Sequence, residues 1–575
     1  MEQSRTKVEK TVSWIHKKQN AIFLIFLIIG AVFLFLKAHF GYFFNDEPFI
    51  LSTGHRLLKG DLPFVHEWNA SQVASFFVVP LMKLYMVLNG SLDGVILYFR
   101  LCYVVLHLLV TVVLYRRVQK YGPISLFCML YYLLFTPLDT MSVTYNAIAL
   151  ASFALFGTYF LTERTTLGDI TAGIILAMGV VASPYTIMVY GIYAVSVMVI
   201  QFTGLKRSSA AACPVFSLKS FLWITAGSAA MAVVFCGYLV SVGLEQILAT
   251  LPYLLAGGNG GIKFPNLIRG LISHDGIQVT LGLALILVSS LDKKRYERSL
   301  VYFSLQTVVW VISMIGITTV HYMRFNVLML PISVLGLQAF VLTKKKDYNL
   351  FFSLWAMGLL FALVSSESSD TGILVFSMGM VLSGMAGILF IAQFAGEFEN
   401  RSDRVKNGVI ALVCIIFFFQ MGCQSFVRLT RTYWDESLFE LRTEITRGAG
   451  RGIRTTKGYA QRYEEIYDDL QLIKAEAQED DAVLIARLFP SAYLDLDMNY
   501  GTFSSWTYYN NRNKYDEFTD QLSSYYEAHP EKLPEYIYVE DEEPEQLRLL
   551  DQVVDLDGYK IIQGKQGLIF AAKGF

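Results

Sequence analysis

The chain has few charged residues for its length. Of its 575 residues, 17% are charged and 54% are hydrophobic, whereas a soluble globular protein carries about a quarter charged residues. This shortage excludes an ordinary soluble protein and predicts a polytopic α-helical membrane protein. The net charge of −1 points to no partner by itself, and we expect no binding to nucleic acid.

Cysteine and the common catalytic motifs are also scarce. None of the six cysteines forms a CxxC pair and none follows Cys423, which is typical of small apolar packing residues and not of disulfides or metal ligands. The C-terminal part contains no HExxH motif. The glycine-rich stretch 257–261 lacks the Gly-Lys-Ser/Thr ending of a nucleotide-binding loop. Neither a zinc protease nor a nucleotide site is indicated.

What the chain does contain is a series of long apolar runs. Lys7, Lys10, Lys17 and Lys18 precede the first run, which predicts a cytoplasmic N-terminus and an extracytoplasmic C-terminus. We expect about 13 transmembrane helices. The expected spans are residues 21–36, 95–115, 124–135, 147–161, 170–182, 186–202, 221–242, 279–291, 300–320, 325–342, 350–364, 373–394 and 409–422.

The segment of residues 72–88 is apolar enough to cross a bilayer, yet it contains Pro80 and Lys83. If it crossed, every later basic loop would face outward, against the positive-inside tendency. We therefore expect a juxtamembrane helix on the outer membrane surface. It would lie within a first outer-face loop of residues 41–94.

The composition changes after the last expected span. Residues 428–575 are predicted to form a soluble extracytoplasmic α/β domain that follows a transmembrane domain of residues 1–427. Its expected helices are 459–477 and 515–528, and its expected strands are 482–486, 536–539 and a hairpin over 559–572.

The first outer loop holds two adjacent carboxylates, Asp46 and Glu47. Two charges beside a bilayer are costly unless something uses them. A carboxylate there can act as a general base toward a hydroxyl, or can hold a divalent metal ion with other oxygens. The structural alternative is that Asn45 or Asp46 caps a helix over residues 47–58. The same loop offers three further candidate substrate-binding residues: His55, His66 and Glu67.

His321, Tyr322 and Arg324 stand at the outer start of a later span. An arginine at head-group level offers a fixed fork of donors to a phosphate, and His321 adds a donor when protonated. The alternative is an arginine that reaches toward lipid head groups in general. Lys263, which follows the glycine-rich stretch, is a further candidate for phosphate binding, or part of a plain flexible loop.

The order of these features resembles the integral-membrane glycosyltransferases of the GT-C fold, and in particular the branch of the protein O-mannosyltransferases and bacterial aminoarabinose transferases. The resemblance implies that Asp46 is the catalytic carboxylate and that Glu47 is the second member of the pair. It also implies that the basic-aromatic-Leu-Pro pattern beginning at His321 binds the phosphate of a lipid-linked donor. A further acid is expected near the start of a later span, where this chain has Asp139 slightly early and Asn146 in place.

The function implied by this resemblance is the transfer of a hexose or pentose from a polyprenyl-phosphate-linked donor, with inversion, to an extracytoplasmic glycan, lipid or protein. The resemblance implies a multi-pass protein of a bacterial plasma membrane, surrounded by membrane lipids, with its active site on the extracytoplasmic face. The sequence establishes no cofactor, and it leaves open whether a divalent metal ion binds. A transporter or flippase of lipid-linked sugars is the alternative, although the nearly charge-free spans disfavour it. A catalytically inactive scaffold is the third interpretation.

Overall fold

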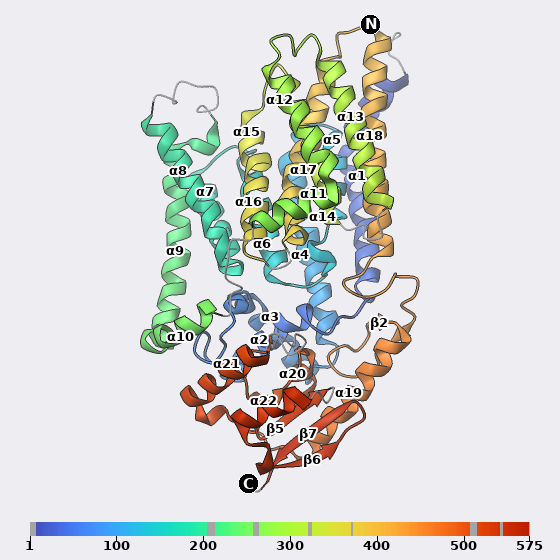
Figure 1. The fold of residues 1–575 in the computed structure, drawn as a ribbon. Coiled ribbons are helices and arrows are strands. Elements are labelled where there is room, and N and C mark those ends of the chain that lie inside the picture. Colours follow the sequence, from blue (N-terminus) through green and yellow to red (C-terminus); the bar gives the residue numbers. More distant parts are fainter. Residues whose placement is uncertain are drawn as a thin grey trace.

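The computed structural model describes residues 7–203, 213–256, 264–319, 325–369, 372–506, 515–540 and 544–573. A long helical bundle and a smaller α/β domain are stacked end to end, and the two chain termini lie at opposite ends of the molecule (Figure 1). The four residues His321, Tyr322, Arg324 and Lys263 lie outside the described residues.

The apolar runs form helices because a helix satisfies its backbone hydrogen bonds internally, as a bilayer requires. Every expected span overlaps a helix of the bundle. These helices are α1 (Lys7–Lys37), α4 (Val95–Val118), α5 (Ile124–Leu133), α6 (Tyr145–Tyr159), α7 (Thr166–Ala182), α8 (Ile187–Phe202), α9 (Leu218–Val242), α12 (Leu283–Leu291), α13 (Ser299–Thr319), α14 (Phe325–Leu342), α16 (Met357–Glu367), α17 (Ile373–Gly396) and α18 (Asp403–Thr430).

Not all of these helices are long and apolar enough to cross a membrane on their own. In the described part of the chain, 9 helices are long and apolar enough to cross a membrane, or up to 10 if the bent pair Phe264–Ser273 and Asp275–Leu291 forms one span. Three shorter apolar helices lie at Ile124–Leu133, Thr166–Ala182 and Leu328–Leu342. The bundle is therefore polytopic, and the number 13 stays a prediction.

Helix α17 forms the centre of the bundle. Of the residues in its most apolar stretch of 18, 94% are buried. The helix packs against α14 and α16. A Cβ atom on Gly336 of α14 would lie 2.1 Å from the Cα atom of Gly387 of α17. The two helix backbones therefore touch where neither residue has a side chain, which is the usual way that helices pack closely in membranes.

The helix α3 (Ser75–Asn89) lies with α2 (Asp46–Leu58) between the bundle and the C-terminal domain (Figure 1). Before α3, the Trp68 N–H donates to the Phe503 carbonyl at 2.8 Å, and after it the Gly94 N–H donates to the Gly448 carbonyl at 2.9 Å. Both carbonyls belong to the C-terminal part of the chain. The two ends of the segment therefore lie beside the same domain. The segment Ala70–Asn89 is also one of the 9 helices in the described part of the chain that are long and apolar enough to cross a membrane, so its juxtamembrane position stays a prediction.

The C-terminal domain is built on a five-stranded mixed sheet with the order β4-β3-β5-β7-β6. Strands β4, β3 and β5 are parallel, whereas β7 and β6 pair antiparallel. The elements are β1 (Thr443–Glu444), β2 (Arg454–Thr455), α19 (Lys457–Glu476), β3 (Ala482–Ile485), α20 (Ser491–Leu496), β4 (Asn499–Tyr500), α21 (Tyr515–Ala528), β5 (Tyr536–Glu540), α22 (Pro544–Val554), β6 (Tyr559–Gln563) and β7 (Gly567–Ala572). The α/β prediction is confirmed, including the hairpin β6–β7.

Candidate functional site

The acidic pair lies at the start of α2, where the bundle meets the C-terminal domain (Figure 1). Both carboxylates are in the first helical turn, at the positive end of the helix dipole. Asn45 occupies the N-cap position, but its side chain makes no capping hydrogen bond. The Asn45 side chain therefore does not cap the helix. The roles of Asp46 and Glu47 follow from the contacts that each carboxylate makes.

Glu47 is buried and fully engaged. Its two carboxylate oxygens accept hydrogen bonds from Arg100 Nε at 2.8 Å and Arg100 Nη2 at 2.6 Å. The same guanidinium donates to the carbonyls of Ala38 and Gly41 at 3.0 and 2.7 Å. Such a bidentate pair is strong and directional. The contacts favour Glu47 as a positioning residue that holds the start of α2 against α4 and the chain after α1.

Asp46 has a different partner. Its Oδ2 accepts a hydrogen bond from the hydroxyl of Tyr433, which follows α18. Burial raises the pKa of the Asp46 carboxyl above its ordinary value, and the hydrogen bond from Tyr433 opposes part of that rise. Burial and the Asp46 charge also raise the pKa of Tyr433, so its hydroxyl stays protonated as a donor. A carboxylate with a raised pKa is a better proton acceptor.

A small cavity of about 10 Å³ opens beside Glu47 and Tyr433. Its lining includes Lys37, Arg100 and Asp139, and Asp46 reaches it through its hydrogen bond with Tyr433. The structure thus brings Asp139 to the cavity that Glu47 borders. The backbone of Asp139 adopts a φ of 61°, in the left-handed region, which costs about 1–3 kcal/mol for a residue with a side chain and is concentrated at functional sites.

Asn146, the alternative to Asp139 near the start of a later span, is buried in the first turn of α6. Its neighbour Tyr145 is close enough to Tyr433 to raise further the pKa of that hydroxyl, after burial and Asp46. Asn146 therefore lies near the site, one residue away from a side chain that acts on it.

Arg428 is a functional candidate that the sequence interpretation missed. It is 0% exposed, and none of its guanidinium nitrogens has a hydrogen-bond partner among the described residues. Its Nη1 lies 3.8 Å from Asp139 Oδ1. Lys37 Nζ donates to the carbonyl of Arg428 itself. A buried cation without hydrogen bonds is costly, and this one stands next to the cavity, so it is suited to an anionic ligand.

In the sequence, Arg428 can be recognised as a functional candidate by its position at the end of the last span. Basic residues are depleted on the face that the positive-inside tendency assigns to the outside. An arginine in the last turn of such a span, such as Arg428 in α18, is therefore unexpected. The change in composition predicts a domain boundary at this residue, whereas α18 continues to Thr430.

The remaining first-loop candidates hold the loop to the C-terminal domain. His55 is buried between the Tyr500 hydroxyl at 3.0 Å and Asp497 Oδ1 at 2.8 Å. Glu67 is buried and accepts from Arg56 Nη1 at 3.1 Å and from the Asn69 N–H at 3.1 Å. These contacts occupy both side chains within the protein, and they favour docking over ligand binding.

Arg56 is the centre of this docking contact. It is 0% exposed, and its guanidinium donates to two carboxylates, two carbonyls and a hydroxyl, which belong to Asp61, Glu67, His66, Thr502 and Tyr525. Burial alone would raise the pKa of Asp61, but Arg56 and Lys532 hold it below its ordinary value. The first loop and the C-terminal domain are therefore joined by a buried ionic network.

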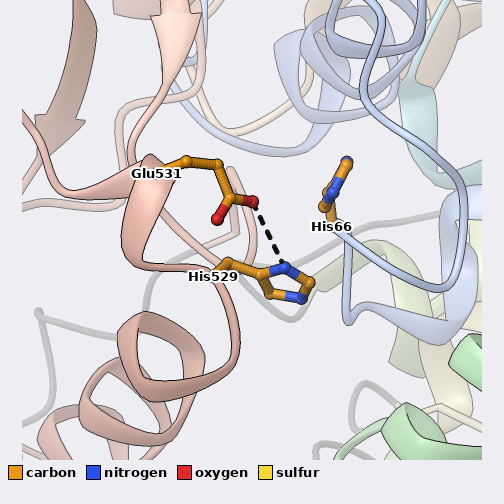
Figure 2. A group of neighbouring side chains, drawn as sticks. All are labelled: His66, His529 and Glu531. Carbon is orange, nitrogen blue, oxygen red and sulfur yellow. Dashed lines mark ion pairs between the residues drawn. The ribbon is translucent and has the colours of Figure 1, made fainter.

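A group of possible metal ligands lies at the same junction. Figure 2 shows His66 of the first loop facing His529 and Glu531 of the C-terminal domain. One ligand atom from each lies within 4.8 Å of the others. His529 Nε2 is buried and has no hydrogen-bond partner among the described residues. Burial lowers the pKa of His66 to about 4 and also lowers that of His529, so both rings are neutral at pH 7.

Two neutral imidazoles and a carboxylate form a donor set suited to Zn²⁺. His529 Nδ1, which lies 3.5 Å from Glu531 Oε1, is the nitrogen that faces the other two groups. The residues present therefore fit a divalent cation.

No protein-family model and no curated protein matches the chain. Among solved structures it is similar to the crystal structure of ArnT from Cupriavidus metallidurans bound to undecaprenyl phosphate. The similarity covers 95% of this chain and 97% of that chain, with 12% sequence identity and a TM-score of 0.45. This similarity assigns no role to any residue of the chain.

Proposed function

We propose that the chain is a membrane glycosyltransferase that moves a hexose or pentose from a polyprenyl-phosphate-linked donor to an extracytoplasmic acceptor. The observation that carries the proposal is the contact of Asp46, a carboxylate with a raised pKa, with Tyr433, which lines a cavity that Lys37 also lines and that Arg428 adjoins. Removal of the proton from an acceptor hydroxyl needs a base such as the Asp46 carboxylate. The negative charge on a departing phosphate needs cations such as Lys37 and Arg428.

In the proposed reaction, Asp46 accepts the proton of the acceptor hydroxyl. The hydroxyl oxygen forms a bond to the anomeric carbon, and the bond from that carbon to the phosphate oxygen breaks. The bonding electron pair leaves with the polyprenyl phosphate, and attack from the opposite side inverts the anomeric centre. Tyr433 orients Asp46 through its hydrogen bond.

Arg428 and Lys37 are the described cations placed to receive the negative charge that develops on the phosphate. We retain His321, Tyr322, Arg324 and Lys263 as proposed contacts to the donor phosphate. Asp139 lines the cavity and is proposed to fix Arg428 beside it.

We place the reaction on the extracytoplasmic face of a bacterial plasma membrane. The cytoplasmic assignment of the other face rests on its basic loops. The donor's isoprenoid chain would lie among the spans, and the acceptor would be a glycan, lipid or protein reached from the side of the C-terminal domain.

We also propose that His66, His529 and Glu531 hold a divalent metal ion. When bound, the ion would tie the first loop to the C-terminal domain and so stabilise the junction in which Asp46 sits. The sugar-transfer steps above use only the side chains of the chain itself.

The proposal is tested with purified protein in proteoliposomes that contain labelled polyprenyl-phosphate sugars and acceptor extracts. We expect a labelled product that depends on the protein. If labelled donor instead crosses the bilayer and no product forms with any donor, the chain is a transporter. The scaffold interpretation is supported if neither product nor transfer across the bilayer is observed.

A further inference from the structure

A second polar cavity lies at the end of the bundle away from the C-terminal domain, where the loops that connect α12 to α13 and α14 to α15 (Tyr348–Leu350) meet (Figure 1). Its volume is about 570 Å³, which is in the range of pockets that hold small ligands. Its lining comes from three separate segments: Cys213 and Pro214, Arg295 and Tyr296, and Lys344 with Lys346 to Asn349.

Two of the cations in this cavity are held in fixed positions. Arg295 donates through Nη1 to the Ser290 carbonyl at 2.9 Å and through Nη2 to the Tyr296 hydroxyl at 3.1 Å. Lys346 donates to two carbonyls at the end of α14, those of Phe340 at 3.0 Å and Val341 at 2.9 Å. Because these contacts are already made, little conformational entropy is lost when a ligand binds.

The positive charge of the cavity is not neutralised by its own acid. Asp347 is the one carboxylate in the lining, and its oxygens accept from the Leu350 N–H and the Tyr121 hydroxyl, each at 3.0 Å. Arg295 Nε is buried and has no hydrogen-bond partner among the described residues. Burial and the nearby Arg295 lower the pKa of Lys346 to about 8, although Glu397 opposes part of this shift. The cavity is thus an open site whose lining carries more positive than negative charge.

We propose that this cavity binds a phosphate group, either that of an anionic lipid head group or that of a soluble phosphorylated compound. A phosphate offers several acceptor oxygens to the free Nε of Arg295 and to the remaining donors of Lys344 and Lys346. The site lies at the opposite end of the bundle from Asp46, so it is independent of the proposed sugar transfer.

Adjacent lysines provide a matched pair of variants. Lys344 and Lys345 are neighbours and both are exposed, but only Lys344 lines the cavity. Basic residues are common in such loops, and a general attraction to anions would treat the two alike. Lys344→Gln and Lys345→Gln therefore separate a built site from a basic surface without removing any of the contacts that fix Arg295 or Lys346.

The full chain is reconstituted in nanodiscs of phosphatidylcholine, and inorganic pyrophosphate is titrated while the midpoint of thermal unfolding is recorded. In parallel, nanodiscs with phosphatidylglycerol are analysed by native mass spectrometry for lipid that stays bound. A saturable shift with pyrophosphate identifies a soluble phosphate site. Retained phosphatidylglycerol identifies a head-group site.

With whichever probe binds, we expect Arg295→Gln to weaken binding about tenfold or more, as the loss of a hydrogen bond to a charged group does. Lys344→Gln should weaken it measurably, and Lys345→Gln should bind like the unaltered chain. The proposal is overturned if neither probe binds the unaltered chain, or if Lys344→Gln and Lys345→Gln have equal effects.

Discussion

The hydroxyl of Tyr433 donates to Oδ2 of Asp46, and 387 residues of sequence separate the two side chains. This contact joins the chain that follows the last span to the first loop. The contact requires the chain that follows α18 to lie beside the start of α2.

The pH dependence of sugar transfer should reveal the Tyr433 contact. Asp46 acts as a base only when deprotonated, so activity should rise with pH through a pKa above about 3.9, the ordinary value for aspartate. Because the hydrogen bond from Tyr433 lowers the pKa of Asp46, Tyr433→Phe should move that rise to higher pH. Initial rates from pH 4 to pH 8 measure the shift, and a rise moved to lower pH would contradict the account.

Arg428 should affect the donor more than the acceptor. Arg428→Gln removes the cation next to the cavity, so KM for the donor should rise and kcat should fall, with a combined loss of about 10²–10³-fold, as for other groups that stabilise developing charge. The control is Arg431→Gln, an exposed arginine three residues later. Equal losses for the two variants would show that Arg428 has no special role.

The Glu47–Arg100 pair should be needed for stability. Glu47→Gln leaves a buried guanidinium without its counter-charge, which costs about 3–5 kcal/mol. The matched control is the exposed pair of Glu444 and Arg454, whose side chains are 51% and 49% accessible; Glu444→Gln should cost at most about 1 kcal/mol. Thermal unfolding in one detergent compares the two. Similar small effects would mean that Glu47 is free for catalysis.

The proposed metal site predicts a defined stoichiometry. Elemental analysis of purified protein should find one divalent ion per chain, and His529→Ala should lose it because His529 supplies the ring nitrogen that faces Glu531. His16→Ala, far from the junction at the start of α1, serves as the control. Protein that contains no metal after dialysis against Zn²⁺ would rule the site out.

The sequence predicted the spans and the sheet elements well, because apolar runs and alternating patterns are local signals. Strand β4 and helix α20 were missed because they have only 2 and 6 residues, too short for a period to show. The sequence predicts a juxtamembrane position for α3 because the basic loops constrain which face each segment occupies.

The site was harder to predict because its contacts are distant in sequence. Asp46 and Glu47 look alike in sequence, yet one meets Tyr433 and the other Arg100. His55 and Glu67 are polar loop residues, and only the docked C-terminal domain shows that both are buried. The sequence around Arg428 offers one indication of its role, namely its position at the end of a span. Nothing in that sequence predicts that Arg428 lies beside Asp139.

The central claim is that Asp46 is the base for sugar transfer, and its substitution by asparagine tests this most directly. Asp46→Asn keeps the size of the side chain and removes the proton acceptor, so labelled product should fall about 10²–10⁴-fold with little change in thermal unfolding. Glu440→Gln, an exposed acid on the same side of the molecule, should retain full activity. Sugar transfer by Asp46→Asn at the rate of Glu440→Gln would contradict the account.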